Sequence, residues 1–463
     1  MPTKLSKFCI AASCKEYTHP WSDSCIVPNV FLGLHCVQEC LKLYTPVYLA
    51  TLLMKGKVPT TEDFRKTLLG ILQSSAFLSW SGFSYSLFIC MLRYLLGHLN
   101  ILTVSFLPSF LSCLTAIYIE RPSRRPLLSL YVSNVATETL FRMGVYRGYF
   151  SPIPKGEIYI FAASMALLLY FFRSRTNKQD SIYKIIRFVI GQNEETEYIE
   201  KNYSPDNRLH SITEDRNTNN EKVPHKQRLN ILLRSFEAYK QIIKRLKAQS
   251  KHVSCPHPHS CAHYVLTGSA KLFSVGIIAQ VTLTLVLQFK RLVKKPELLK
   301  HTLLNKKTTH LALFLGGFSG LYKLVSCLLR RALGKDSNYY AIPAGLLGSI
   351  AFMAYPNNTI ALYFMWKALQ ISWNDLQEKG IVPEVKWFVI FLYCFSTSVL
   401  FHTAIIEPQN LRSSYWKFLY NLSGGRIATM SRSVIDQFGF ESGKHLQDVL
   451  RKTGTTDKLI FNY

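Results

Sequence analysis

The sequence predicts an all-α integral membrane protein built from two tandem copies of a unit of about four transmembrane helices, with about eight to ten such helices in total. Three observations lead to this fold class: apolar blocks of membrane-spanning length, basic residues beside those blocks, and an internal sequence match. Hydrophobic residues make up 48% of the 463 residues and charged residues only 18%. The polar residues gather between the blocks, so the composition indicates a membrane protein with polar connecting segments.

The apolar blocks are predicted to be transmembrane helices because each approaches the roughly 20 residues that cross a bilayer. Those of the first copy are Leu68–Leu96, Ile101–Ile119, Leu127–Val145 and Ile158–Phe172. Those of the second copy are His310–Leu333, Tyr340–Tyr355, Thr359–Trp373 and Trp387–Ile406. A soluble core helix would carry a polar face at every turn, and most of these blocks lack one.

Each copy is preceded by an amphiphilic segment that either crosses the membrane or lies flat on it. These segments are Val30–Met54 and Val265–Phe289. Four crossings per copy would leave the copies parallel, whereas five would invert them. The basic linker and the basic run Lys290–Lys307 favour one common side, and therefore four crossings.

An internal match indicates the duplication. Phe77–Gly97 and Phe314–Gly334 align without a gap. The alignment pairs identical residues of several chemical types, namely Tyr85 with Tyr322, Cys90 with Cys327 and Arg93 with Arg330. Apolar composition alone would match leucines but would not place tyrosine, cysteine and arginine in register. Ser181–Gly191 matches Ser414–Gly424 in the same way.

The match divides the chain into five predicted parts. They are an N-terminal Cys/His segment (1–29), membrane repeat 1 (30–191), a polar basic linker (192–254), membrane repeat 2 with a leading Cys/His cluster (255–424) and a C-terminal tail (425–463). The linker is rich in Glu, Asn, Lys and Arg and is predicted to be a loop. Its last stretch, Arg228–Ala248, has helical apolar spacing, which fits either a surface-bound amphipathic helix or a solvated one.

The formal net charge of +27 would suggest a nucleic-acid partner in a soluble protein. Here the basic residues flank apolar blocks, as at Arg121, Arg124 and Arg125, where they orient spans and attract anionic headgroups. No zinc-finger spacing or aromatic-interleaved basic strand accompanies them. The sequence therefore predicts membrane lipids as partners and no nucleic acid.

A polar stripe is predicted on the third span of each copy. Asn134, Glu138 and Arg142 recur every four residues, so they share one helix face, and Glu138 and Arg142 are spaced for an ion pair. Charges at membrane depth pair or line a polar cavity, so a polar cleft is one interpretation. The alternative is a helix that ends near Thr139, with Arg142 reaching the headgroups. A softer stripe in the second copy consists of Tyr363, Lys367, Gln370 and Asn374.

Two small-residue motifs are predicted to bring helices close together. Gly144 and Gly148 form one Gly-x-x-x-Gly motif, and Gly316 and Gly320 form the other. Such spacing lets backbones approach in lipid, where hydrophobicity gives helices no reason to associate.

Each copy also opens with cysteine and histidine residues at close spacing, and each of these segments contains His-Pro followed shortly by Ser-Cys. The candidate metal ligands are Cys14, His19, Cys25, Cys255, His257, His259, Cys261 and His263. Imidazole and thiolate are the usual zinc ligands, and copper accepts the same groups. A disulfide or redox pair and a purely structural packing role are the alternatives, so the cofactor is left open, with zinc as a candidate.

The sequence shows no phosphate-binding glycine loop, no Gly-x-Ser-x-Gly elbow and no His-Glu-x-x-His motif. We therefore expect the protein not to be an enzyme. A metal-dependent membrane enzyme that uses the Cys/His segments is the remaining enzymatic alternative.

Ala136–Gly144, read as ATETLFRMG after Arg-Pro-Ser-Arg-Arg, resembles the transmembrane protein 135 family. The resemblance continues through Leu411–Leu419 and the opening His19-Pro-Trp. The central segment is also similar to peroxisomal membrane protein 4, and both resemble the Tim17/Tim22/Tim23 group of four-span proteins. That relation implies a Tim17-like four-span repeat with a lateral polar cavity.

Membership of this family implies a multi-pass protein of peroxisomal and mitochondrial membranes that acts in organelle organisation, lipid metabolism and the balance of mitochondrial fission and fusion. The implied partners are a dynamin-related fission GTPase and peroxisomal membrane import receptors. The sequence supports two non-enzymatic hypotheses: passage of a lipid or metabolite through the polar cleft, and a scaffold that recruits fission or import machinery through linker and tail.

Overall fold

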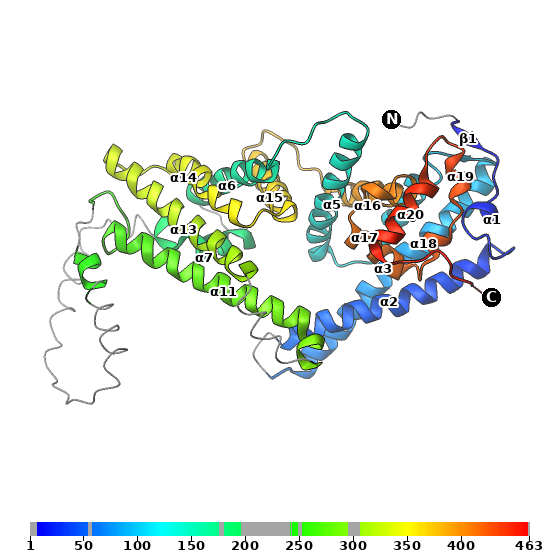
Figure 1. The fold of residues 1–463 in the computed structure, drawn as a ribbon, viewed down its shortest axis with the longest axis horizontal. Helices are drawn as coiled ribbons and strands as arrows, with labels where there is room; N and C mark the ends of the chain where they lie inside the picture. The colour runs from blue at the N-terminus through cyan, green and yellow to red at the C-terminus, as the bar shows by residue number, and fades with distance from the viewer. Residues whose placement is uncertain are drawn as a thin grey trace. The chain divides into compact units, whose positions relative to one another are not determined.

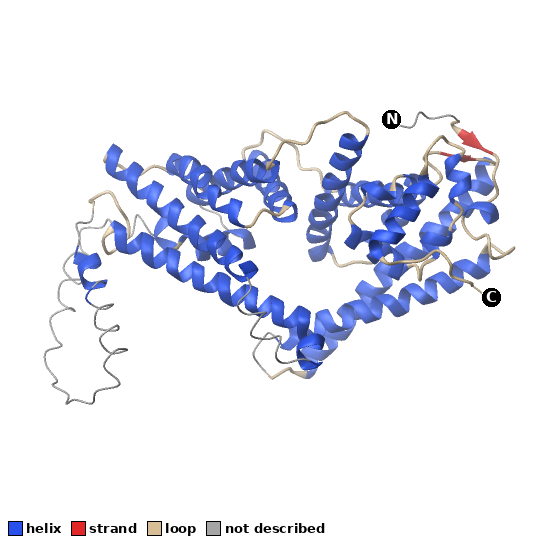
Figure 2. Cartoon of the chain, in the orientation of Figure 1, coloured by secondary structure: helices blue, strands red, loops and turns tan. Residues whose placement is uncertain are grey.

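The computed structural model describes residues 7–53, 58–175, 180–195, 241, 243–248, 252–294 and 306–461. Helices dominate these ranges, and the one sheet within them is an antiparallel pair of two-residue strands, β1 (Cys9–Ile10) and β2 (Leu99–Asn100) (Figure 2). The chain forms two compact units. Unit 1 comprises Met1–Ile153 and Gly380–Tyr463, and unit 2 comprises Pro154–Lys379.

Five helices that pack in series form the core of unit 1. In chain order they are α2 (Ile26–Leu53), α3 (Thr61–Leu96), α4 (Phe106–Ile117), α5 (Arg125–Tyr146) and α16 (Phe388–Ile406). α2 packs on α3, α3 packs on α4, and α16 packs against both α4 and α5 (Figure 1). Shorter elements complete the unit: α1 (Cys14–Tyr17), η1 (Pro122–Arg124), η7 (Pro408–Asn410), α17 (Ser413–Leu422), α18 (Arg426–Thr429), α19 (Arg432–Asp436) and α20 (Ser442–Thr453).

Unit 2 repeats this packing order with other segments. It contains α6 (Gly156–Ser174), α7 (Ser181–Ile190), η2 (Gln192–Glu194), α11 (Cys261–Lys294), α13 (Lys306–Leu333), η5 (Asn338–Tyr340), α14 (Ala341–Gly348), η6 (Ser349–Ala354) and α15 (Asn358–Glu378). α11 packs on α13, α13 packs on α14, and α6 packs against both α14 and α15. The role of α16 in unit 1 is therefore played by α6 in unit 2.

The compact units thus differ from the predicted sequence ranges 30–191 and 255–424. The fourth helix of the first predicted copy, α6, packs within unit 2, and the fourth helix of the second copy, α16, packs within unit 1. Periodicity and local matches cannot reveal such an exchange, because it depends on contacts between segments far apart in the chain. The predicted linker and its amphipathic segment Arg228–Ala248 lie largely outside the described residues.

The helix ends follow from local sequence. Thr60 caps α3 through a capping box with Asp63, which satisfies free N–H groups of the first turn. α3 then ends at Gly97, whose φ of 73° is a left-handed conformation that only glycine adopts without strain. Gly334 ends α13 in the same way, with φ 68°.

Aromatic side chains fill both cores. In unit 2 the ring of Phe161 stacks on Phe352 with centroids 4.2 Å apart, and Phe314 meets both. In unit 1 Phe77 packs on Tyr393 across α3 and α16, and Trp416 of α17 is fully buried. Offset and edge-to-face contacts of this kind add specificity to apolar burial.

Five of the described helices are long and apolar enough to cross a membrane: α3, α6, α16, the Cys261–Leu285 part of α11 and the Thr309–Leu333 part of α13. Many of their aliphatic side chains face outward, such as Leu266 at 54% and Ile278 at 64% exposure. Such surfaces suit lipid rather than water. The chain is an all-α multi-pass membrane protein.

Five spans are fewer than the predicted eight to ten. α4 has 12 residues and so reaches only about 18 Å of the ~30 Å hydrocarbon layer. The predicted block Tyr340–Tyr355 is divided between α14 and a 3₁₀ segment. The predicted blocks Val30–Met54, Leu127–Val145 and Thr359–Trp373 correspond to helices α2, α5 and α15. Polar and charged residues make these three helices less hydrophobic than a typical transmembrane helix, so they are not among the five candidate spans.

The two glycine motifs have different surroundings. Gly316 and Gly320 lie against Ser269 of α11, where an added Cβ would sit 3.0 to 3.1 Å from its atoms, as helix-helix packing requires. Gly144 instead accommodates the ring of Phe150 from its own unit, and Gly148 lies beyond the end of α5 with φ 77°. Gly144 and Gly148 were predicted to form a helix-packing face, but they lie at the C-terminal end of α5 and the turn after it, because α5 stops at Tyr146.

Candidate functional site

Three cysteines and one histidine converge in unit 1. Cys14 begins α1, His19 follows it, Cys25 precedes α2, and Cys90 projects from α3. The Cys14 and Cys25 sulfurs are 3.3 Å apart, and the Cys90 sulfur lies 3.8 Å from Nε2 of His19. All four potential ligand atoms lie within 4.8 Å of one another. The arrangement offers a metal ion four ligands, three cysteine sulfurs and one histidine nitrogen.

The short helix α1 holds this loop in place. Its first turn is closed by a capping box between Ser13 and Glu16. Tyr17 is fully buried and donates its hydroxyl to the Val104 carbonyl at 3.0 Å. Arg93, one turn after Cys90 on α3, donates to the Ala12 carbonyl at 2.5 Å. The loop and the helix end are therefore fixed against each other on both sides of the cluster.

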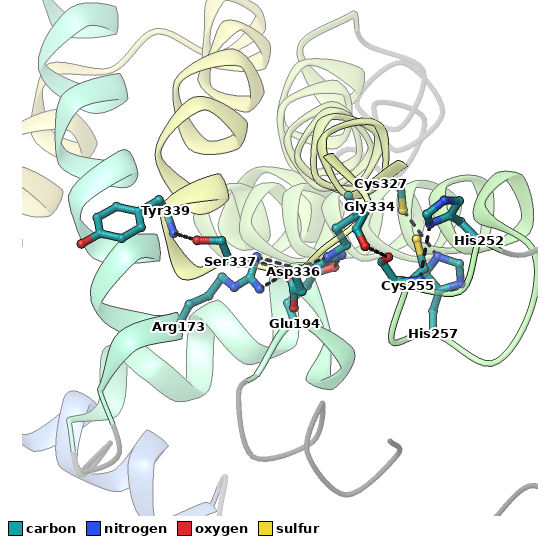
Figure 3. A network of polar contacts seen from close by, with 12 residues as sticks. Arg173, Glu194, His252, Cys255, His257, Cys327, Gly334, Asp336, Ser337 and Tyr339 are labelled. Atoms are coloured by element: carbon teal, nitrogen blue, oxygen red, sulfur yellow. Dashed lines mark hydrogen bonds and ion pairs between the residues drawn. The ribbon is translucent and has the colours of Figure 1, made fainter. Parts of the chain in front are cut away.

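A second cluster of the same composition occurs in unit 2. Cys255 and His257 lie in the loop before α11, Cys261 is the first residue of α11, and Cys327 lies on α13. The Cys255 and Cys261 sulfurs are 3.7 Å apart, and the Cys327 sulfur lies 3.4 Å from Nε2 of His257. Figure 3 shows Cys255, His257 and Cys327 pointing toward one another. The neighbouring Ser254 hydroxyl donates to the Gly334 carbonyl at 2.6 Å.

The structure brings together six of the eight predicted metal ligands and adds two. His259 and His263 stand outside the second cluster, where their rings meet edge to face with centroids 5.1 Å apart. The added members are Cys90 and Cys327. Their register match was visible in the sequence, but nothing local connects them to loops more than 60 residues away.

An apolar pocket opens beside the first cluster in unit 1. It lies among α2, α3, α16 and α17. Apolar side chains make up most of its wall, including Leu32, Phe401, Leu419 and Leu422. Arg426 contributes a positive charge at the wall. Small-molecule sites commonly have such a lining, in which apolar side chains dominate and a few polar groups orient the ligand.

A second pocket borders the cluster of unit 2 and is lined by other residue types. Lys271, Lys323 and three histidines contribute to it. The Lys323 ammonium lies 4.7 Å from the centre of the Tyr264 ring, a cation–π contact. Most of the surface exposed in both pockets is apolar, but the wall in unit 2 includes two lysines and three histidines, whereas the wall in unit 1 includes one arginine and one histidine.

Buried ion pairs join the ends of several elements in unit 2 (Figure 3). Arg330 of α13 donates to both carboxylate oxygens of Glu194 at 3.1 and 2.6 Å, and its Nε donates to Asp336 at 2.9 Å. Arg173 of α6 donates to the same Asp336 oxygen at 2.6 Å. Burial alone would raise the pKa of Glu194, but the charge and hydrogen bonds of Arg330, with the charge of Arg173, lower it to about 2.

The predicted stripe on α5 is largely buried and internally paired. Arg142 donates to Glu138 at 2.5 Å, which confirms the spaced ion pair. Arg412, before α17, pairs with the other Glu138 oxygen. Asn134 is buried on the same face. The Glu138 carboxylate thus joins two parts of unit 1, an arrangement that fits a structural role as well as a cleft.

The stripe on α15 in unit 2 is less uniform. Lys367 is buried and pairs with Asp180 at 2.7 Å and with the Gln370 amide oxygen at 3.0 Å. Tyr363 is half-buried, and Asn374 is exposed. Lys367 therefore connects α15 to the start of α7.

Residues 11–145 match the family model of the N-terminal cysteine-rich region of Transmembrane protein 135. This match supports the transmembrane protein 135 family for the N-terminal part of the chain. The matched range contains Cys14, His19, Cys25 and Cys90, the complete cluster of unit 1. No solved structure matches the chain. The relation to peroxisomal membrane protein 4 and to the Tim17 group stays a prediction.

Proposed function

We propose that this transmembrane protein 135 family member handles lipids in peroxisomal and mitochondrial membranes by holding the apolar chain of a lipid in the pocket of unit 1. The observation that carries the proposal is the apolar wall formed by α2, α3, α16 and α17. Each CH₂ group that leaves water for such a wall contributes about 0.8 kcal/mol. The bilayer buries the same apolar chain, so burial alone does not favour the pocket over the membrane. The lipid headgroup must therefore also form hydrogen bonds or an ion pair with the protein.

Arg426 supplies that polar contact. Its guanidinium lines the pocket and already donates to the Ser423 carbonyl at 3.0 Å, which orients it. Guanidinium groups bind carboxylates and phosphates through two parallel hydrogen bonds. The ligand class is therefore an anionic amphiphile, such as a fatty acid or a phospholipid.

Family membership supports the organelle and the cellular role. By regulating how such lipids are held, the protein would influence organelle organisation and the fission-fusion balance, with a dynamin-related fission GTPase and peroxisomal membrane import receptors as partners. The internal sequence match and the common packing order of the two units support a duplicated, four-helix origin for both.

The structure favours lipid holding over the polar-cleft hypothesis because Glu138 is engaged by Arg142 and Arg412. The scaffold hypothesis rests on a linker that lies largely outside the described residues. The enzyme alternative would need an open coordination position, whereas each cluster already offers four protein ligands.

The test compares two substitutions of one kind on one helix. Leu32 lines the pocket, whereas Leu34, two residues further along α2, is 62% exposed. Leu32→Trp should fill the pocket and lower the lipid that remains bound after detergent purification by about tenfold, the equivalent of ~1.4 kcal/mol. Leu34→Trp should retain lipid at the wild-type level. Lipid bound to each protein is quantified by native mass spectrometry.

Two further results would bear on the proposal. Equal lipid content in the wild type and in both tryptophan variants would overturn it. The double substitution Glu138→Ala and Arg142→Ala should leave lipid content unchanged, and a loss as large as that of Leu32→Trp would favour the polar cleft instead.

A further inference from the structure

We propose that the protein binds two structural zinc ions, one in each unit, each held by three cysteine thiolates and one histidine. The ligands in unit 1 are Cys14, His19, Cys25 and Cys90. The ligands in unit 2 are Cys255, His257, Cys261 and Cys327. This assignment is independent of the proposed lipid function.

The separations between donor atoms fit a tetrahedral metal ion. Zinc–sulfur bonds of about 2.3 Å at tetrahedral angles place two sulfurs about 3.8 Å apart, and a sulfur and an imidazole nitrogen slightly closer. The measured sulfur–sulfur distances are 3.3 Å for Cys14 and Cys25, and 3.7 Å for Cys255 and Cys261. The sulfur–nitrogen distances are 3.8 Å in unit 1 and 3.4 Å in unit 2. A disulfide would require about 2.05 Å between two sulfurs.

Both histidines are oriented in the way that metal ligands require. Nδ1 of His19 lies 3.0 Å from the Ser22 carbonyl oxygen, and Nδ1 of His257 lies 2.6 Å from the His259 carbonyl oxygen. A carbonyl only accepts, so Nδ1 carries the proton and donates it, which leaves the lone pair of Nε2 directed at the three sulfurs. Such an outer hydrogen bond fixes the tautomer of zinc-bound histidine.

The two loops share the order His-Pro followed by Ser-Cys but differ in spacing and in the position of the first cysteine. In unit 1 the first cysteine precedes the histidine by five residues and starts a helix, whereas in unit 2 only Pro256 separates Cys255 from His257. In both units the fourth ligand comes from one helix position, since Cys90 and Cys327 align in the internal match. Loops of different spacing that bring the same donors to one helix position point to a shared ligand rather than to packing.

The donor set selects zinc among common metals. Three thiolates and one imidazole form a standard closed zinc site, in which all four positions are protein ligands. Magnesium and calcium prefer oxygen donors. Thiolates also bind monovalent copper, but a closed tetrahedral set of four protein ligands is the arrangement of structural zinc sites. Binding releases the protons of the three thiols to solvent and closes the loop onto the helix. The ion therefore ties the loop before α2 to α3, and the loop before α11 to α13.

The metal content of the full-length protein, purified in detergent without chelator, tests the proposal directly. Elemental analysis should give two zinc ions per chain. Cys90→Ser and Cys327→Ser should each lower the content to one, and the double variant should contain none. Cys113→Ser is the matched control because Cys113 is also buried on a helix of unit 1 but lies outside the cluster; it should retain two.

Replacing each histidine by cysteine, another zinc ligand, distinguishes the loss of a ligand from misfolding of the variant. His19→Cys and His257→Cys should keep the metal, because four thiolates also bind zinc, whereas His19→Ala and His257→Ala should lose one ion each. Cobalt supplied in place of zinc should give the visible absorption of a tetrahedral thiolate site. Protein that contains no zinc, or whose mass shows disulfides between Cys14 and Cys25 and between Cys255 and Cys261, would overturn the proposal.

Discussion

Units 1 and 2 share a packing order but differ in what occupies corresponding positions. Arg93 and Arg330 each follow a cluster cysteine by three residues. In unit 1 Arg93 is half-buried and donates to a backbone carbonyl. In unit 2 Arg330 is fully buried between two carboxylates. The same helix position therefore binds a loop backbone in unit 1, through Arg93, and pairs with two carboxylates in unit 2, through Arg330.

The comparison extends to the pockets. Apolar residues of α16 and α17 enclose space in unit 1, whereas lysines and histidines line the pocket of unit 2. We propose that each of the two units has a Cys/His cluster, while unit 1 binds an apolar chain and unit 2 is stabilised by buried ion pairs. The following predictions test that division.

The largest expected effect is the loss of the buried pair in unit 2. Arg330→Met should destabilise the protein by about 3 to 5 kcal/mol, because Glu194 would remain buried without its partner. Arg93→Met should cost only about 1 kcal/mol, the net value of one hydrogen bond. Thermal unfolding of both variants in the same detergent gives the comparison.

A double variant sharpens that result. Adding Glu194→Gln to Arg330→Met removes the unpaired charge and should recover part of the lost stability. Equal destabilisation by Arg330→Met and Arg93→Met, or no recovery in the double variant, would contradict the assigned difference between the units.

A smaller effect is expected from pH. The pKa of Glu194 is lowered from 4.5 to about 2 in the folded protein. A depressed carboxyl pKa stabilises the fold fully above the unfolded value of 4.5, and this stabilisation is lost as pH falls through about 2. The wild type should lose on the order of 3 kcal/mol over that range through this group.

Glu194→Gln is the control for this prediction, since it removes the titrating group and should show a correspondingly flatter pH profile. Unfolding curves recorded at several pH values for both proteins measure the difference. Parallel profiles for the two proteins would show that Glu194 does not carry this pH dependence.

Sequence reasoning succeeded where ligands and pairs are local. The spacing of Glu138 and Arg142 predicted their ion pair, and the Cys/His segments contain three of the four residues in each cluster. It failed where the partner is distant. Glu194 was assigned to a polar linker, yet it pairs with an arginine 136 positions away. Nothing in the local pattern marks such a partner.

Helix counting failed for a different reason. Hydropathy alone treats Tyr340–Tyr355 as one apolar block, but the backbone changes from α-helix to 3₁₀ at Ser349. The exchange of α6 and α16 between the predicted copies was also invisible, because both helices are predominantly apolar and composition does not reveal which segments they pack against.

Photolabelling is the most direct measurement of the central claim, that unit 1 has specialised in binding an apolar chain. A fatty acid with a diazirine in its chain would be crosslinked to the full-length protein in bilayers, and the label that unlabelled fatty acid competes away would be mapped by peptide mass spectrometry. The account predicts saturable labelling of α2 and α17, abolished by Leu32→Trp and retained by Leu34→Trp. Saturable labelling concentrated in the helices of unit 2, or none that competes, would contradict it.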